Sequence, residues 1–420
     1  AYHGIKGSGA SDTLIVTNSG TIEGRNGSGV NSNGTGTLTN YGTITGTYDP
    51  AASFGDGDGV DFDQAATVYN YGTIKGLGSK GTKPGEEKPS TSEGIAIGGG
   101  TIVNGDATHT SALISGANNG ILVDDSNGGD AFAAMSVTNY GTIQGLDGYG
   151  IRYVNSGVDG SKSLTVVNYG TISGSTYAVE MGGGNDLFVY HTGSKVTGIV
   201  DAEGGTDTLQ LGALGDNVTF DASLIGDAAT YRHFERVTAE AQTLTTLTGT
   251  STFAGDLVFD QSALALDNAS LGEANLILSG NDTNAGVLTG NGTLGSLAAS
   301  GTVFLAPGTS SAPYGTLAVT GNATLAGTYL VDVAPNGKTD LITVGGTATI
   351  AEGAQVEMYG ALAWSRIYTI VSSDTQVSGT FAGLTVANPI NYLFVTPELS
   401  YDDTRVTLAL ERTGVAFASY

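Results

Sequence analysis

The stretch N-Y-G-T-I occurs four times in this chain, beginning at Asn40, Asn70, Asn139 and Asn168, and a close copy, N-S-G-T-I, begins at Asn18. Successive copies start 22, 30, 69 and 29 residues apart, so the 69-residue gap predicts a missing copy near its middle. A degenerate copy is present there, with Asn104, Ile114 and Gly116 in register with the others. Repeats of about 20 to 50 residues are typical of solenoids, propellers and arrays.

The residue types in each repeat favour strands over helices. Thr, Val, Ile and Tyr dominate, with Gly and Asn at the expected corners. A glycine or small residue followed by a β-branched residue recurs after each copy, so we expect two short strands per unit. This pattern excludes helical repeats, and the elastic period disfavours propeller blades. The sequence therefore predicts an all-β fold, an elongated parallel β-helix (β-solenoid) with inserted loops.

The N-Y-G-T-I repeat is interpreted as a corner followed by a core position. Alternate strand residues point inward, so aliphatic residues should stack along the axis. These are Leu38 and Ile44, Val68 and Ile74, Val137 and Ile143, and Val166 and Ile172. The glycine after Tyr and the glycine after T-I-x are expected at positive φ, where a Cβ is costly.

The asparagines and tyrosines of the repeat are the first candidate site. Asn40, Asn70, Asn139 and Asn168 are expected to be structural turn and ladder residues, with recognition by a partner as the alternative. Tyr41, Tyr71, Tyr140 and Tyr169 are expected either to stack within the solenoid or to form an exposed ridge for adhesion or sugar contact. Both sets are candidates for self-association.

The composition is that of a glycine-rich, acidic β protein without cysteine. The 420 residues include 67 Gly, and 40% are hydrophobic, which is enough for a core. Lys and Arg total 15 against 40 Asp and Glu, so the net charge is −25 and the pI is about 4.1. Phosphate backbones and anionic lipid surfaces repel such a chain, so we expect no nucleic-acid partner.

Two insertions interrupt the repeat and are expected to form loops on one flank. The first, at 77–93, is expected to protrude and is either a solvated loop or a ligand-contacting one. Its charged candidates are Lys80, Lys83, Glu86, Glu87 and Lys88. The second groups Asp124, Asp125 and Asp130.

Signals for catalysis are weak. Asp124 and Asp125 are the best pair for acid–base work on a polysaccharide, but adjacent strand residues point to opposite faces. The motif G-x-S-x-G is absent, and the four histidines have no companion motifs. We therefore expect no enzymatic activity and no cofactor.

A calcium site is a minor alternative. G-G-G-N-D-L-F and G-G-T-D-T-L superficially match a calcium-binding nonapeptide and contain Asp186 and Asp207. Tandem nonapeptides repeat every nine residues, whereas these aspartates are 21 apart. We expect them to shape turns.

The C-terminal part resembles a known family. The segments are LAPGTSSAPYGTLAVTGNATLAGTYLVDV from Leu305, SRIYTIVSS from Ser365 and TPELSYDDTRVTLALER from Thr396. They resemble the pertactin-like end of passenger domains of type Va autotransporters, and the N-x-G-T-I-x-G repeats also look like those of such passengers.

The resemblance implies a right-handed β-helix exported through the outer membrane of a Gram-negative bacterium, with a C-terminal region that promotes folding. The implied division is 1–240 for the repeats, 241–299 for further coils, 300–411 for the chaperone region and 412–420 for a linker towards an outer-membrane barrel outside this sequence. The implied core positions of the chaperone region are Leu317, Val319, Leu325, Tyr329, Val331, Leu341, Ile342, Val344, Ile367, Tyr368, Ile370, Phe381, Leu384, Val406, Leu408 and Leu410.

The expected function is that of an adhesin or self-associating virulence protein at the cell surface or outside the cell. Its expected partners are a host surface protein or glycan, other copies of itself, and its own barrel during export. The first alternative is a released effector that signals through a host receptor. A polysaccharide-acting enzyme is the second.

Overall fold

The computed structural model describes residues 3–47, 57–78, 92–157, 162–364, 366–387 and 395–412. Within these ranges the chain is almost entirely β-strand, with one 3₁₀ turn, η1 (Ala222–Leu224). The predicted fold class is confirmed, since nearly all strand pairs are parallel and join successive coils of a solenoid. No helix of the described part is long and apolar enough to cross a membrane.

The chain divides into two compact units. The first is Ala1–Gln210 with Asp227–Glu235, and the second is Leu211–Gly226 with Arg236–Tyr420. The strands up to residue 211 are β1 (Ile5–Lys6), β2 (Thr13–Asn18), β3 (Thr21–Arg25), β4 (Val30–Ser32), β5 (Thr35–Asn40), β6 (Thr43–Thr47), β7 (Val60–Phe62), β8 (Ala66–Asn70), β9 (Thr73–Gly76), β10 (Ile95–Ile97), β11 (Gly100–Asn104), β12 (Leu113–Gly116), β13 (Ile121–Val123), β14 (Met135–Asn139), β15 (Thr142–Gly145), β16 (Ile151–Tyr153), β17 (Leu164–Asn168), β18 (Thr171–Glu180), β19 (Leu187–Tyr190), β20 (Lys195–Asp201) and β21 (Thr208–Leu211).

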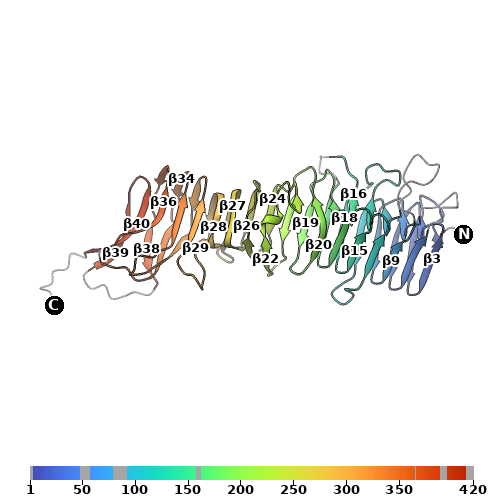
Figure 1. Ribbon diagram of the computed structural model, residues 1–420, viewed down its shortest axis with the longest axis horizontal. Helices are drawn as coiled ribbons and strands as arrows, with labels where there is room; N and C mark the ends of the chain where they lie inside the picture. Colours follow the sequence, from blue (N-terminus) through green and yellow to red (C-terminus); the bar gives the residue numbers. More distant parts are fainter. Residues whose placement is uncertain are drawn as a thin grey trace. The chain divides into compact units, whose positions relative to one another are not determined.

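The remaining strands are β22 (Asn217–Asp221), β23 (Tyr231–Arg232), β24 (Arg236–Ala239), β25 (Leu244–Thr248), β26 (Asp256–Asp260), β27 (Ala263–Gly280), β28 (Gly286–Gly301), β29 (Val303–Pro307), β30 (Thr316–Val319), β31 (Ala323–Leu325), β32 (Thr328–Val333), β33 (Leu341–Val344), β34 (Thr347–Ile350), β35 (Gln355–Gly360), β36 (Tyr368–Ser373), β37 (Gln376–Ser378), β38 (Gly383–Val386), β39 (Val395–Tyr401) and β40 (Arg405–Arg412). Figure 1 shows the strands of each unit side by side.

Each complete coil of the first unit contributes three strands, not two. One coil consists of β4, β5 and β6, and each of these pairs in parallel with its counterpart in the next coil, β7, β8 and β9. The sequence pattern predicts one strand across each N-Y-G-T-I copy, but the chain bends at the Asn-Tyr-Gly corner and forms two strands there. The corner therefore separates a strand ending at Asn from a strand beginning at Thr.

Aliphatic rows along the solenoid axis form the core, as predicted. Leu38 pairs with Val68, and Ile44 pairs with Ile74 one coil later. The same rows continue through Val137 and Val166 and through Ile143 and Ile172, and all eight predicted side chains are fully buried. Burial of one such side chain stabilises a fold by roughly 1.5–3 kcal/mol, so the rows supply a large share of the stability.

The prediction that the repeat glycines need positive φ is wrong. None of the described glycines that follow Tyr or T-I-x in the repeats has a positive φ. They are required because another stretch of backbone is too close, in the preceding coil for Gly42 and in the following turn of the same coil for Gly116. A Cβ at Gly42 would lie 2.0 Å from the carbonyl oxygen of Gly20, and one at Gly116 would lie 1.7 Å from that of Asn119.

The second unit also stacks its strands in parallel, includes longer strands, and ends in an antiparallel hairpin. β27 and β28 pair along most of their lengths, while β39 and β40 form an antiparallel hairpin whose second strand pairs with β36. Most of the core positions implied by the resemblance are buried. The assignment of Ile367 to the core is wrong, since 73% of this residue is exposed just before β36 begins. Leu341, Leu384 and Leu410 are only half-buried.

Gly20 and Gly42 form a matched pair that tests the steric role of the repeat glycines. They occupy the same repeat position, but a Cβ at Gly20 would meet nothing within 4 Å. We predict that Gly42→Ala destabilises the first unit by about 1–3 kcal/mol, because the backbone of the preceding coil must move.

Gly20→Ala should stay within about 0.5 kcal/mol of the parent chain. Thermal unfolding followed by circular dichroism measures both variants. Equal midpoints for the two would contradict the close contact between coils.

Candidate functional site

A continuous ladder of asparagine side chains lies at one corner of the first unit. Each amide nitrogen donates a hydrogen bond to the side-chain oxygen of the equivalent asparagine one coil on. The links are Asn18 to Asn40, Asn40 to Asn70 and Asn70 to Asn104, each 2.8 Å, then Asn104 to Asn139 and Asn139 to Asn168, each 2.9 Å. Five of the six asparagines are fully buried, so their hydrogen bonds link the coils from within.

The chemistry of the amide explains why this residue recurs. A primary amide has both donors and an acceptor, so identical side chains can link in a chain, whereas stacked carboxylates would repel. Asn40 Nδ2 also lies 3.2 Å from the carbonyl oxygens of Gly42 and Thr73, which satisfies the corner backbone. The ladder ends after Asn168, because Tyr190 occupies the next register position.

A row of aromatic side chains runs beside the ladder, which we call the aromatic row. Its members are Tyr41, Tyr71, His109, Tyr140, Tyr169 and His191. Ring centroids are 5.1 Å apart for Tyr41 and Tyr71 and 4.4 Å for Tyr140 and Tyr169, and both pairs are stacked. His109 packs on Tyr71 at 5.1 Å, and His191 stacks on Tyr169 at 3.7 Å.

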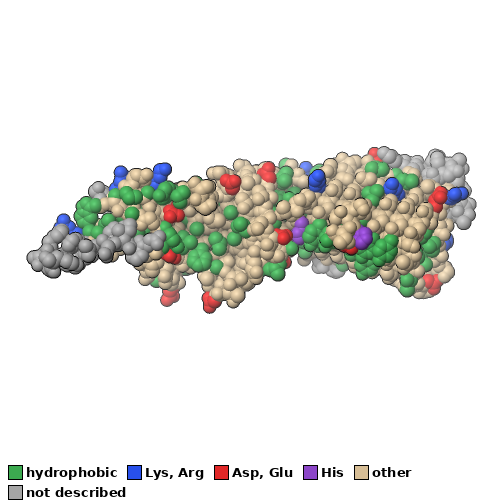
Figure 2. All heavy atoms as spheres, turned by 90° about the horizontal axis from the view of Figure 1, so that it is seen from below, with side chains coloured by type: hydrophobic (Ala, Val, Ile, Leu, Met, Phe, Trp, Pro, Cys, Tyr) green, Lys and Arg blue, Asp and Glu red, His purple; other side chains and the backbone are tan. Residues whose placement is uncertain are grey.

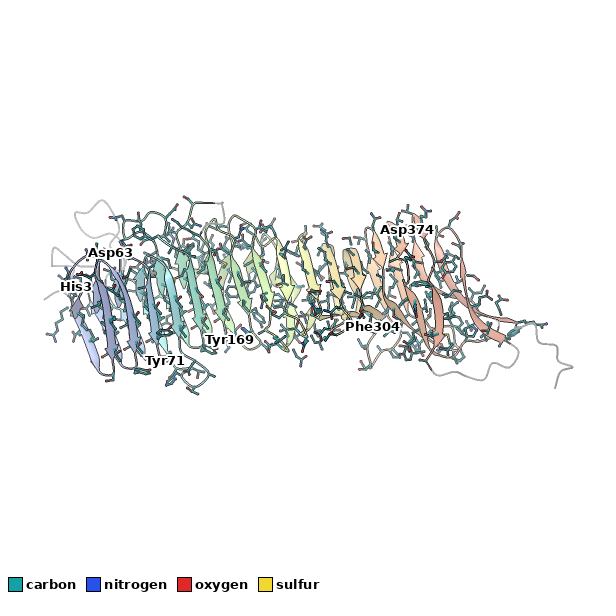
Figure 3. The ribbon with its side chains drawn as sticks, turned by 180° about the vertical axis from the view of Figure 1, so that it is seen from behind. His3, Asp63, Tyr71, Tyr169, Phe304 and Asp374 are labelled. Carbon is teal, nitrogen blue, oxygen red and sulfur yellow. The ribbon has the colours of Figure 1, made fainter. Side chains whose placement is uncertain are left out.

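The aromatic row combines the two arrangements that the sequence left open. Rings on adjoining coils contact one another in two groups, Tyr41 to His109 and Tyr140 to His191. They nevertheless lie on the outside, with Tyr41 55% and Tyr169 39% exposed. Figure 3 shows Tyr71 and Tyr169 along one edge of the stacked strands, with Asp63 towards the opposite edge. Figure 2 shows a face on which hydrophobic side chains gather between two histidines. The row therefore offers ring edges and hydroxyls to solvent.

The sequence patterns did not predict the two histidines of the row. His191 follows Tyr190 as Tyr169 follows Asn168, so alignment of the degenerate coil could have found it. His109 comes from the loop between β11 and β12 and has no such signal. Its ring Nδ1 lies 2.9 Å from Asp106, and hydrogen bonds from Thr108 and His109 hold the pKa of that carboxyl well below its usual range.

The other candidates from the sequence do not join this site. The charged residues of the 77–93 insertion, Lys80, Lys83, Glu86, Glu87 and Lys88, lie outside the described residues. Asp124 Oδ1 accepts the Ser126 amide at 2.8 Å, and Asp125 Oδ1 accepts the Gly129 amide at 2.7 Å. These carboxylates shape the turn after β13.

Asp186 and Asp207 are buried carboxyls that tie one coil to the next. Asp186 Oδ1 accepts the Leu164 amide at 2.6 Å, and Asp207 Oδ1 accepts the Asp186 amide at 2.7 Å. Glu235 Oε2 accepts the Asp207 amide at 2.7 Å. Within the described residues, no three His, Cys, Asp or Glu side chains are grouped closely enough to hold a metal ion.

Burial changes the titration of this pair. The second oxygen, Oδ2, of both Asp186 and Asp207 is buried without a hydrogen-bond partner. Burial raises the pKa of Asp186 to about 8, and the Asp207 charge adds to the effect. Burial also raises the pKa of Asp207 to about 7, with a contribution from Glu235. Both carboxyls therefore hold a proton more tightly in the folded state.

Among the residues that the structure describes, His109 and His233 each pair with a carboxylate. His109 Nδ1 faces Asp106, and His233 Nδ1 lies 2.6 Å from Asp201 Oδ1. Among the described residues, no serine hydroxyl is hydrogen-bonded to either of these histidines.

Comparison with known proteins finds similarity in sequence to a bacterial extracellular protein and in structure to a bacterial adhesin. The chain is 32% identical to an extracellular serine protease of Serratia marcescens over 185 residues, which cover 41% of this chain and 16% of that protein. The Haemophilus influenzae Hap adhesin matches in structure over 95% of this chain and 64% of the other, with 11% identity and a TM-score of 0.24, too low to carry an argument. No protein-family model matches the chain. The similarity to an extracellular bacterial protein supports the passenger interpretation in its broad form.

Asn104 and Asn18 test the asparagine ladder. Asn104 has ladder neighbours on both sides, whereas Asn18 has one. We predict that Asn104→Ala lowers the free energy of unfolding by about 1–3 kcal/mol, because it leaves the buried oxygen of Asn139 without its ladder donor. Asn18→Ala should lower the free energy of unfolding by less than Asn104→Ala does. Chemical denaturation measures both, and equal losses would contradict a cooperative ladder.

Asp186 and Asp207 predict an unusual pH dependence. An unfolded aspartate titrates near pH 4, so the two buried carboxyls favour folding most below that pH. Their contribution falls as the pH rises from about 4 to about 8, since the folded state must then keep a proton that the unfolded state releases. Asp186→Asn should therefore be more stable than the parent chain at pH 8 and flatten this slope.

Thermal midpoints from pH 4 to pH 9 measure the effect. Asp340 in the second unit has a raised pKa as well, so the difference between variant and parent isolates Asp186. An unchanged slope in Asp186→Asn would contradict the assignment.

Proposed function

We propose that this chain is part of an autotransporter passenger, displayed on or released from a Gram-negative cell, and that it acts as an adhesive and self-associating surface protein. The parallel β-solenoid, the C-terminal resemblance and the similarity to an extracellular bacterial protein support the passenger assignment. The adhesive role rests on the aromatic row.

The observation that carries the adhesive role is the repetition of exposed rings at one edge. Tyr41 and Tyr71 present similar groups on two adjoining coils, and so do Tyr140 and Tyr169, while the coil between these pairs contributes His109. Adjoining coils are spaced about 4.8 Å apart. A partner with the same repeat, such as a second copy of the solenoid, can engage several rings at once. Individually weak contacts then add through effective concentration. Tyrosine suits this role because it offers apolar area and a hydroxyl at low entropic cost.

Export and folding complete the proposal. The region 300–411 would fold first and serve as the template on which further coils stack, which fits the nearest-neighbour character of solenoids. Its partner during export would be its own outer-membrane barrel. Outside the cell, the proposed partners are a host surface protein or glycan and other copies of this chain, with no role for nucleic acid because of the charge of −25.

Two other functions compete with adhesion. A released effector would act on a host receptor as a soluble protein. A hydrolytic role is suggested by the name of the Serratia relative, of which the chain covers only 16%. Casein hydrolysis by the purified chain, inhibited by a serine-directed reagent, would favour that role over adhesion.

Replacement of all four row tyrosines tests the adhesive role. We predict that Tyr41→Ser, Tyr71→Ser, Tyr140→Ser and Tyr169→Ser together reduce the settling of bacteria that display the chain, and their attachment to host cells, by at least about tenfold. The loss follows because the exposed ring edges are removed while the buried asparagines remain. Surface display is checked by antibody labelling.

The matched control removes exposed apolar groups elsewhere in the first unit. Phe132 and Leu146 are 49% and 56% exposed and lie outside the row. Phe132→Ser with Leu146→Ser should settle and attach like the parent chain. Unchanged settling and attachment in the tyrosine variant would refute the role of the row. Stimulation of host cells by the soluble chain, with attachment absent, would favour the effector.

A further inference from the structure

A second cluster of polar side chains lies on the first unit, away from the aromatic row. Four strands that are neighbours in the sheet place polar residues in one register line. Arg152 on β16 pairs with Glu180 on β18, Glu180 with Asp201 on β20, and Asp201 with Arg232 on β23. The line therefore spans four rungs, with two carboxylates in the middle and an arginine at each end.

The two carboxylates in this line are each held in a fixed pair. Arg152 Nε donates to Glu180 Oε2 at 2.6 Å, with the glutamate side chain only 15% exposed. His233 Nδ1 lies 2.6 Å from Asp201 Oδ1, with 10% of the aspartate and 46% of the histidine side chain exposed. In each pair a shielded carboxylate orients a more accessible nitrogen group. Such groups can hydrogen-bond a ligand without reorganising.

Two stacked tyrosines form one side of the cluster. Tyr149 and Tyr177 occupy equivalent positions one coil apart, with ring centroids 5.4 Å apart and an angle of 22° between their planes. The Arg152 guanidinium lies 5.0 Å from the centre of the Tyr149 ring. Burial raises the pKa of the Tyr149 phenol, and the neighbouring Glu180 carboxylate raises it further. The apolar ring surface is thus continuous with the polar line.

Glu203 and His233 show that the backbone is strained at this cluster. Their φ angles are +63° and +58°, in the left-handed region that residues other than glycine rarely adopt. Backbone strain of this kind is often found at functional sites. Glu203 faces Glu180 and Asp201, and burial followed by these two charges raises its pKa.

We propose that this cluster of Tyr149, Arg152, Tyr177, Glu180, Asp201, Glu203 and His233 is a binding site for a neutral saccharide chain. A sugar ring has an apolar C–H face and a rim of hydroxyls that both donate and accept hydrogen bonds. The tyrosines fit the first feature, and the planar guanidinium, imidazole and carboxylates fit the second. The inference rests on the proposed adhesive function and names a ligand class for it.

The charge balance selects among ligands. Three carboxylates here, and a net charge of −25 on the chain, disfavour sulfated, phosphorylated or uronate-rich chains. A basic peptide would have to compete with Arg152 and His233 for the carboxylates that those residues already hold. A neutral saccharide needs no change in these pairs, and a linear one can follow the line over its four rungs.

Calorimetric titration of the purified chain tests the site. The probes are cellohexaose, laminarihexaose, maltohexaose and chitohexaose, with a heparin hexasaccharide and hexalysine as charged comparisons. We expect at least one neutral probe to bind. Tyr177→Ala and Arg152→Gln should each weaken that binding by at least about tenfold.

Because Arg152→Gln leaves Glu180 unpaired, His233→Asn and Glu203→Gln serve as further variants, and asparagine tolerates the left-handed backbone. Arg25→Gln is the control, since Arg25 pairs with Glu23 at an exposed site on β3. Circular dichroism confirms folding.

The inference is overturned if no neutral probe binds, if only hexalysine or heparin binds, or if binding persists in all four site variants. Any of these three outcomes would leave the proposed adhesive function intact. That function is tested separately, by replacing the row tyrosines in displayed protein on cells, without added saccharide. Neutral binding that the site variants weaken and Arg25→Gln retains would support the site.

Discussion

The register between successive coils is the constraint on which the first unit depends. Parallel backbone hydrogen bonds pair each residue with its equivalent one repeat away, as Asn40 pairs with Asn70. Since equivalents always meet equivalents, every inward position must be apolar, every corner must allow close approach, and a buried polar residue must be able to bond its own kind. The asparagine ladder, the aliphatic rows and the corner glycines each satisfy one of these requirements.

The same constraint produces the outer surface. A residue that points outward in one coil recurs about 4.8 Å away in the next, so single side chains become rows. Tyrosines become stacked pairs at one edge, and charged residues become a register line across neighbouring strands. Solenoids of this kind can therefore recognise partners through repetition, and insertions such as the loop that carries His109 modify the rows locally.

Much of the fold could be predicted from the repeats, because periodicity reports directly on register. The eight predicted core residues and the degenerate copy at Asn104 are confirmed. The prediction of positive φ for the repeat glycines is wrong, because the sequence shows only that a glycine is needed. It does not show whether the reason is a positive φ or the lack of room for a Cβ. Ile367 was misplaced because a chain that enters β36 from a loop need not follow strand alternation. His191 was missed because its coil has lost the asparagine, and the charged pairs around Arg152 were missed because their partners are 28 or more residues apart.

Cysteine cross-linking tests the register most directly, since the chain has no cysteine of its own. Thr39 and Tyr69 are paired on β5 and β8, whereas Thr67 lies two residues out of register with Thr39. Disulfides require Cα atoms roughly 4.4–6.8 Å apart. Under mild oxidation, Thr39→Cys with Tyr69→Cys should form a disulfide within one chain, and Thr39→Cys with Thr67→Cys should not. The opposite outcome would contradict the stacking of equivalent residues.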